Sequence, residues 1–374
     1  MATDFIVIGG GIAGAAAAYF LAERGHVTVL EREDAPGYHT TGRSAALFNE
    51  NYGPTAVRLL TRASGAFYRD PPPGFGEAPL LQPRGSMIVA PPGMEAKLQQ
   101  ALAEMQQTVA TIHAIDPKEA LALCPMLRPE AVGAAIYEPT ATDMDVHAIH
   151  QGFLRGLRAR GGTLVTRAEV RSLARRDGVW TAATSAGDFA APVVVNAAGA
   201  WADEMGKLAG ARPIGLEPKR RTAFLIDPPA GLDARHWPMV DDFREVVYFK
   251  PESGRILVSP MDETPSAPMD AQPEEIDIAE AVEHLQAIAA VEVTRIQRKW
   301  AGLRSFVRDR VPVAGPVPEA PGFHWLAGQG GYGIMTSPAM GRIAAALACG
   351  ETIPADILAT GLKPADVLPG RLFA

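Results

Sequence analysis

The first thirty residues alternate between short apolar runs and a stretch of small residues. Residues 5–8 are apolar and rich in β-branched side chains, which is typical of a strand buried on both faces. The alanine-rich segment that follows predicts a helix over 12–24, and residues 27–30 repeat the pattern of the first strand. The hydrophobic pattern therefore predicts a β-α-β unit at the start of the chain.

Three regularly spaced glycines join the first strand to the helix. Gly9, Gly11 and Gly14 fit the spacing G-x-G-x-x-G. The first allows a tight turn, the second lets backbone approach a pyrophosphate, and the third lets the helix pack close to the sheet. Glu31 ends the second strand, about 20 residues on, where an acid that binds a ribose is expected. We therefore predict a dinucleotide site, with a purely structural β-α-β unit as the alternative.

Periodicity predicts the remaining elements. Further helices are predicted at 54–68, 94–107, 147–160, 276–290 and 334–348. Further strands are predicted at 80–81, 87–89, 163–165, 170–174, 179–183, 191–196, 219–226, 246–250, 256–259, 294–306 and 323–327. Between 213 and 306 the alternation predicts an antiparallel sheet covered by one helix. Residues 137–144 are predicted to form a loop that returns the chain to its first domain.

Three later segments are also rich in small residues. Residues 36–46 combine glycines and hydroxyl side chains with one arginine, and both 197–201 and 328–333 lie between a strand and a helix. Such turns bring backbone N–H groups and helix N-termini toward a negatively charged ligand. Ordinary polar loops and strand-to-helix packing remain the alternative for each segment.

Composition limits the kind of protein. The chain has 374 residues and 47% hydrophobic content, which suggests two domains rather than one. We expect no membrane span and no secretory signal. The net charge of −7 argues against a nucleic-acid partner. Cys124 and Cys349 lack metal-type spacing, so we expect no metal site, two reduced cysteines and a cytoplasmic protein.

Four segments resemble a known family and occur in its order. They are the N-terminal glycine motif, TTGRSAA at 40–46, VVNAAGAWA at 194–202 and AGQGGYGI at 327–334. The chain resembles the superfamily of FAD-dependent D-amino-acid oxidases and dehydrogenases. Within it, the segments HQGFLRG, EPKRRTAF and WAGLRSF make the chain most similar to the D-arginine dehydrogenases.

The resemblance implies a mixed α/β and α+β fold. Residues 1–78, 143–212 and 307–374 would form a discontinuous Rossmann-like domain that binds FAD on a parallel sheet. Residues 79–142 and 213–306 would form a substrate domain built on an antiparallel sheet with helices.

The resemblance also implies a noncovalently bound FAD and assigns residues to its parts. The residues implied for the ADP half are Gly9, Gly11, Ile12, Ala13, Gly14, Glu31 and Arg32. Those implied for the diphosphate and flavin side are Thr41, Gly42, Arg43, Ser44 and Ala45. Those implied near the adenine are Val170, Ala198, Gly199 and Trp201. Those implied for the pyrimidine end of the flavin are Gly330, Gly331, Tyr332, Gly333 and Ile334.

The same resemblance implies a substrate site beside the flavin. Arg221 and Arg304 would pair with a substrate carboxylate, and Tyr248 and Tyr52 would donate further hydrogen bonds. The expected reaction is oxidative deamination of a D-amino acid, in which hydride passes from Cα to flavin N5 and the imine hydrolyses to a 2-oxo acid. Because guanidinium charge lowers the pKa of the substrate amine, no protein base is strictly required.

The residues implied for the side-chain pocket are Leu47, Ser86, Asp241, Met335 and Gly331. In the arginine-preferring relatives, glutamate stands in place of Ser86, histidine in place of Leu47 and glutamine in place of Met335. These changes favour an apolar side chain over arginine, because an unpaired guanidinium is costly to bury. Asp241 stands where an apolar residue is expected, and it leaves a rebuilt cation site open.

Three other functions remain open at this point. One is oxidation of a glycine-, sarcosine- or proline-like amine by the same cofactor. Another is an FAD-binding subunit without catalysis, and an NAD-dependent dehydrogenase is the least favoured. The resemblance favours a dehydrogenase with an unknown electron acceptor, and the sequence leaves an oxidase open.

Overall fold

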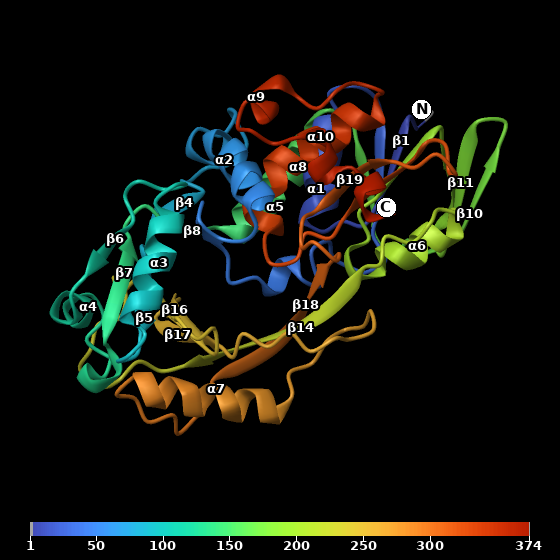
Figure 1. Cartoon of the computed structure of the whole chain (residues 1–374). Coiled ribbons are helices and arrows are strands. Elements are labelled where there is room, and N and C mark those ends of the chain that lie inside the picture. Colours follow the sequence, from blue (N-terminus) through green and yellow to red (C-terminus); the bar gives the residue numbers. More distant parts are fainter. Residues whose placement is uncertain (1–2, 374) are drawn as a thin grey trace.

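Two large sheets organise the molecule, and the chain passes between them several times. The computed structural model describes residues 3–373. Figure 1 shows helices α1, α5 and α8 gathered around one sheet, with β14 and β18, which belong to the second sheet, extending away from it. No helix in this part of the chain is both long and apolar enough to cross a bilayer.

The first sheet has six strands in the order β19-β20-β13-β1-β2-β9. Five of them pair in parallel, and β19 runs antiparallel to β20 at one edge. The strands are β1 (Phe5–Ile8), β2 (Val27–Leu30), β9 (Thr163–Val165), β13 (Val193–Asn196), β19 (Val313–Pro316) and β20 (Phe323–Ala327).

The side chains of β1 point alternately to the two faces of this sheet, and both faces are covered by other elements. Phe5 and Val7 pack with α1 (Ile12–Leu21), α5 (Val146–Ala159) and α8 (Gly333–Ala348). Ile6 and Ile8 pack on the opposite side, against a three-stranded sheet and α6 (Ala202–Leu208). The small sheet consists of β10 (Val170–Arg176), β11 (Val179–Thr184) and β12 (Gly187–Ala191). The continuous apolar run of β1 is therefore explained by a three-layer sandwich.

The second large sheet has eight strands in the order β18-β14-β17-β16-β15-β5-β7-β6. All neighbours are antiparallel except β15 and β5. The strands are β5 (Ser86–Ala90), β6 (His113–Ile115), β7 (Ala134–Glu138), β14 (Glu217–Ile226), β15 (Met239–Asp242), β16 (Tyr248–Glu252), β17 (Arg255–Ser259) and β18 (Arg298–Phe306).

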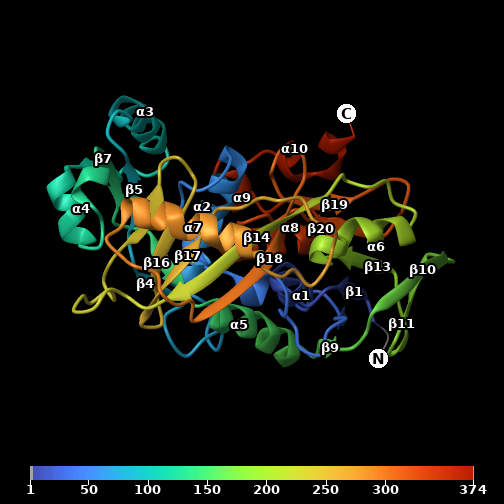
Figure 2. The same ribbon diagram turned by 90° about the horizontal axis from the view of Figure 1, so that it is seen from below.

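The two faces of the eight-stranded sheet have different roles. Phe224 and Phe249 are buried under α7 (Glu275–Ile288), which lies across β14 and β17 (Figure 2). Ala223 and Tyr248, the preceding residues on the same strands, point to the opposite face. That opposite face is the one that reaches the cavities described below.

Several smaller elements complete the fold. A second small sheet pairs β8 (Thr142–Met144) with β3 (Leu47–Phe48) and β4 (Leu81–Pro83). The helices not yet named are α2 (Thr55–Arg69), α3 (Glu95–Met105), α4 (Pro117–Leu123), α9 (Ala355–Leu358) and α10 (Pro364–Val367).

The prediction of a loop over 137–144 was wrong. This segment contains the end of β7 and all of β8. Both strands are held by partners distant in sequence, since β7 pairs with β5 and β8 pairs with β3 and β4. Local periodicity does not reveal such pairing. Helix α1 also ends earlier than predicted, at Leu21, because residues 22–25 form turns.

Candidate cofactor and substrate site

Two adjoining cavities open where strands of the six-stranded sheet end. One measures about 130 Å³ and extends toward the eight-stranded sheet, and the other measures about 410 Å³ and extends toward β10. Gly11, Thr41 and Ala197 line both cavities. Open α/β sheets bind ligands at this place, outside the carboxyl ends of their strands.

The first glycine turn sets the N-terminus of α1 at the cavities. A Cβ on Gly14 would lie 1.9 Å from the carbonyl oxygen of Gly9, so only glycine allows α1 to lie this close to β1. Gly9 has φ of 102°, and a Cβ there would meet the Ala197 carbonyl oxygen at 2.4 Å. As a result, Gly11, Ile12 and Ala13 present backbone at the cavity wall.

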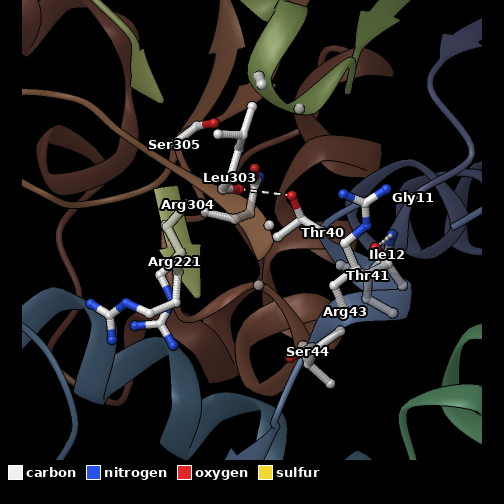
Figure 3. A pocket seen from close by; sticks show the side chains of 18 of the residues that line it. Gly11, Ile12, Thr40, Thr41, Arg43, Ser44, Arg221, Leu303, Arg304 and Ser305 are labelled. Carbon is white, nitrogen blue, oxygen red and sulfur yellow. Dashed lines mark hydrogen bonds between the residues drawn. The ribbon is translucent and has the colours of Figure 1, made fainter. Parts of the chain in front are cut away.

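A short 3-10 helix, η1 (Thr41–Arg43), connects the two halves of the site. The Thr41 hydroxyl accepts from the backbone N–H of Ile12 at 3.0 Å, and the Thr40 hydroxyl donates to the Leu303 carbonyl at 2.7 Å (Figure 3). One of these bonds holds α1 and the other holds β18. The segment 40–45 therefore fixes the glycine turn relative to the substrate-side sheet.

Arg43 lines the first cavity, and three of the five N–H donors of its guanidinium bind protein groups. It donates to the carbonyl oxygens of Ala271 at 3.1 Å and Ala301 at 2.9 Å, and it pairs with Asp270. The structure therefore gives this side chain a role in holding η1 against β18.

Glu31 and Arg32 face the second cavity. The Glu31 carboxylate accepts from the backbone N–H of Gly10 at 2.8 Å and of Glu33 at 2.9 Å. The Arg32 guanidinium lies 4.7 Å from the centre of the Trp201 ring. The implied residues that line this cavity are Gly9, Gly11, Glu31, Arg32, Thr41, Val170, Ala198, Gly199 and Trp201.

The glycine-rich turn at 328–333 closes the first cavity at the start of α8. Gly330, Gly331, Gly333 and Ile334 all line it. Gln329 lines it as well, and its side-chain Nε2 is buried without a hydrogen-bond partner. Sequence reasoning missed Gln329, because an unsatisfied donor becomes visible only once its surroundings are known.

Three of the implied cofactor residues do not line these cavities. Gly14 and Gly42 act through backbone packing, and a Cβ on Gly42 would lie 2.7 Å from the carbonyl oxygen of Gly37. The Tyr332 ring is buried and packs edge-on against Tyr52, with ring centres 5.1 Å apart. Its contact with the site is therefore indirect, through Tyr52.

These features fit FAD. The two cavities join end to end, as an adenosine half and a flavin half require. Backbone of Gly11–Ala13 and the N-terminus of α1 are available for the diphosphate. The unpartnered Gln329 amide and the N-terminus of α8 provide donor groups at the flavin end.

Two arginines lie on the far wall of the first cavity, the one of about 130 Å³, which we call the flavin-side cavity. Arg221 comes from β14 and Arg304 from β18, and Figure 3 shows their side chains next to each other, across from Gly11 and Ile12. The Arg304 Nη1 donates to the Tyr52 hydroxyl at 3.2 Å. The Arg221 Nε donates to the Asp262 carbonyl at 2.8 Å, and its Nη2 lies 3.5 Å from Glu263.

The two guanidinium groups influence each other. Burial, followed by the charge of Arg304, lowers the pKa of Arg221. Burial also acts to lower the pKa of Arg304. The nearby oxygens of Tyr52 and Tyr248 act in the other direction, and the net effect is a raised pKa for Arg304. Two adjacent buried cations create a site that favours an anion, and a carboxylate matches the planar fork of a guanidinium.

A third, smaller cavity of about 90 Å³ continues from the arginines. It shares Arg221, Tyr248 and Arg304 with the flavin-side cavity. All residues implied for the substrate pocket line it: Leu47, Tyr52, Ser86, Arg221, Asp241, Tyr248, Arg304, Gly331 and Met335. Met239 and Met261 also line it and were not predicted from the sequence.

Two carboxyl groups with raised pKa values lie on the cavity side of the eight-stranded sheet. Burial raises the pKa of Asp241 to about 7, and Glu245 adds to this while Arg221 and Arg304 oppose it. Burial also raises the pKa of Glu138 to about 7, although its carboxylate accepts from Asn51 at 3.2 Å. Of the two, only Asp241 lines the small cavity.

Residues 3–373 contain no group of three or more histidine, cysteine, aspartate or glutamate side chains placed to hold a metal ion. Cys124 is buried, Cys349 is partly buried, and both are free thiols.

Comparison with known proteins places this architecture. The chain is 26% identical to mitochondrial dimethylglycine dehydrogenase of Homo sapiens over 370 residues, which is 91% of this chain. It spans only 42% of the length of that relative.

Solved structures share the fold over nearly the whole chain. L-proline dehydrogenase from P. horikoshii superimposes with a TM-score of 0.79 at 25% identity, covering 94% of this chain and 95% of the other. L-α-glycerophosphate oxidase from Mycoplasma pneumoniae, solved with FAD bound, gives a TM-score of 0.84 at 19% identity, covering 95% and 97%.

A family model described as FAD dependent oxidoreductase (DAO) matches residues 4–347. This match includes the glycine motif at 9–14, the small-residue turns at 197–201 and 328–333, and both arginines. FAD is therefore the cofactor of this chain. The chain belongs to the DAO family of FAD-dependent oxidoreductases.

Proposed function

We propose that this chain oxidises the carbon–nitrogen bond of a small amine that carries a carboxylate, with a glycine-, sarcosine- or proline-like compound as the favoured substrate. FAD supplies the hydride acceptor when it is bound. Arg221 and Arg304 hold the carboxylate, and the hydroxyls of Tyr52 and Tyr248 orient it. The imine product is released to water, where it hydrolyses.

The observation that carries the proposal is the position of the arginine pair. Both guanidinium groups lie where the flavin-side cavity meets the small cavity. An acid held at this junction has its neighbouring carbon next to the flavin-side cavity. Holding the substrate in one orientation contributes much of the rate of such a transfer. A subunit that binds FAD without turnover would not need this pair.

The favoured substrate class rests on the size of the pocket and on the relatives. The small cavity of about 90 Å³ suits a short molecule. Relatives named for dimethylglycine and L-proline support an amine of this type. D-arginine is disfavoured, because Ser86 stands where the arginine-preferring relatives have the glutamate that pairs with the guanidinium group.

A D-amino acid with an apolar side chain is the second candidate. Leu47, Met239 and Met335 form an apolar part of the small cavity wall. Methionine adapts its shape to irregular apolar groups, so this wall can accept a short branched side chain.

We also propose that the division into an FAD domain and a substrate domain follows the boundaries predicted from the sequence.

Anaerobic mixing of the FAD-loaded protein with a panel of amines tests the proposal. The panel contains sarcosine, dimethylglycine, glycine, both enantiomers of proline, and both enantiomers of leucine, methionine and arginine. We expect loss of the oxidised flavin absorbance with one of the small or cyclic amines. Fast reduction by D-leucine or D-methionine alone would favour the second candidate. Reduction by none of them would reject both.

A further inference from the structure

Asp241 differs from Asp262 and Glu263, two other acids near the arginine pair, in having no partner. Among the described residues, no hydrogen bond or ion pair engages its carboxylate, whereas those two acids are engaged. Asp262 accepts from Thr222 at 2.7 Å, and Glu263 pairs with Arg310 at 2.6 Å. A carboxylate that lines a cavity without a protein partner is available to a ligand.

The register of the sheet shows where Asp241 faces. It lies opposite Tyr248 on β16 and beside Ile88 on β5, so its side chain shares a face with the site tyrosine. It lines the small cavity but not the flavin-side cavity. Its place is therefore in the small cavity, close enough to the arginine pair for their charges to act on it.

The charges on this wall match a zwitterion. Arg221 and Arg304 favour an anion, and Asp241 is the one acid lining the small cavity within the part of the chain that the structure describes. A glycine- or proline-like amine carries one carboxylate and one ammonium group, separated by a single carbon. With its carboxylate on the arginines, its nitrogen is the only cation that Asp241 can meet.

We propose that Asp241 binds the amine nitrogen of the substrate and accepts the proton that this nitrogen loses before oxidation. The inference rests on the proposed function and adds a catalytic residue to it. The proton passes from the ammonium nitrogen to a carboxylate oxygen of Asp241. The freed lone pair is then available to form the carbon–nitrogen double bond, and bound FAD would accept the hydride that the adjacent carbon gives up.

The surroundings of Asp241 suit a group that exchanges a proton near neutral pH. The ionisable groups around it are Arg221 on β14, Arg304 on β18, Tyr248 on β16, Tyr52 on the loop after β3, and Glu245 in the turn after β15. Strand β5 contributes only the uncharged Ser86 and Ile88. Burial and Glu245 raise its pKa to about 7, against the two arginines.

The pH dependence of kcat/KM tests the proton transfer. In the wild type, kcat/KM for the best amine should rise with pH as Asp241 loses its proton, with a midpoint at about 7. D241N should lose this rise and lower kcat/KM at neutral pH by about 10²- to 10⁴-fold, as for loss of a general base. Part of the rate should return in alkaline solution, where the free amine is present.

Glu138→Gln is the matched control. Glu138 lies on the same face of the sheet, opposite Ser86, and burial also raises its pKa to about 7. It does not line the small cavity. E138Q should therefore keep the wild-type pH profile. Loss of the rise in E138Q but not in D241N would overturn the assignment.

A binding measurement tests the amine contact without turnover. α-Aminoisobutyrate and pivalate have nearly the same shape, carry no oxidisable Cα–H bond, and differ in the ammonium group. Each is titrated into FAD-loaded protein, and the flavin absorbance reports binding. D241N should weaken the binding of α-aminoisobutyrate by about 10-fold or more, which is the loss expected for a charged hydrogen bond. The affinity for pivalate should stay unchanged or increase.

Equal effects of D241N on both ligands, or an unchanged pH profile with kcat/KM near the wild-type value, would overturn the inference. A selective loss of activity on diamino substrates alone would also overturn it, since Asp241 would then bind a side chain. A wild-type protein that oxidises no amine would reject the proposed function, while the binding titration would still decide the role of Asp241.

Discussion

Adjacent arginines on β14 have opposite roles because a strand alternates its side chains. Arg221 faces the cavity, whereas Arg220 faces away and pairs with Glu274 and Asp277. The sequence KRRTAF alone does not reveal which arginine meets the substrate. The structure separates them by the face of the sheet on which each lies.

We expect Arg221→Lys to lower kcat/KM for the best amine by about 10- to 150-fold, since a lysine cannot replace a bond to the carboxylate worth about 1.5–3 kcal/mol. Steady-state kinetics with the FAD-loaded variant measures this. Arg220→Lys, one residue away, is the control and should stay within about threefold of the wild type in the folded protein. Similar losses in both variants would contradict the placement of Arg221.

At the residue scale, the sequence predicted those site residues that lie in segments shared with the related family. The arginines, tyrosines and pocket residues came from the resemblance, and the structure brings them together around the small cavity. Gln329, Met239 and Met261 were not predicted. Each belongs to a strand or turn whose neighbours are distant in the sequence, so its contact with the site depends on the assembled fold.

At the scale of elements, the contact between β1 and α1 decides whether the cofactor turn forms. We expect Gly14→Ala to separate them, because its Cβ would lie 1.9 Å from the Gly9 carbonyl oxygen. The variant should lose bound FAD and about 1–3 kcal/mol of stability.

The flavin-to-protein absorbance ratio and thermal unfolding measure the two effects of Gly14→Ala. Gly370→Ala is the control, since a Cβ there would meet nothing within 4 Å. A Gly14→Ala protein with full FAD content and an unchanged unfolding temperature would contradict this account of the turn.

Elements with strong local patterns were predicted well. The first strand, the second strand and the strand at Phe323–Ala327 have the bounds that the sequence predicts. Strands β6, β12, β15 and β19 were not predicted. They are three to five residues long, and β15 is held by β5, which lies about 150 residues earlier. Short strands of this kind are specified by their partners rather than by their own periodicity.

At the scale of the whole molecule, the site depends on how two sheets with different partners meet. The six-stranded sheet supplies the glycine turns, and the eight-stranded sheet supplies the arginines and Asp241. Thr40 and Arg43 connect the two through Leu303 and Ala301 of β18. The general fold class was predicted from the sequence, but this connection was not, since its hydrogen bonds join residues over 250 positions apart.

Burying acids between these layers makes stability depend on pH. The pKa of Glu138 is about 7 in the folded protein and 4.5 in its ordinary state. The folded state therefore holds the proton more tightly than the unfolded state does. The favourable contribution of Glu138 to the stability of the folded protein is complete below about pH 4.5 and is lost as the pH rises to about 7.

Glu138→Gln should remove this dependence while keeping an acceptor for Asn51. We expect the variant to be more stable than the wild type at about pH 8 by about 1–3 kcal/mol, and to show little difference at about pH 4.5. Thermal or denaturant unfolding at the two pH values measures it. A stability difference that does not change with pH would contradict the buried, proton-binding state of Glu138.

The central claim is that guanidinium groups of the second sheet hold a carboxylate next to FAD on the first. Titration of pivalate into FAD-loaded wild type, Arg221→Ala and Arg304→Ala, followed by flavin absorbance, tests it most directly. We predict a saturable spectral change in the wild type that is lost or greatly weakened in both variants. An identical change in all three proteins would contradict the claim.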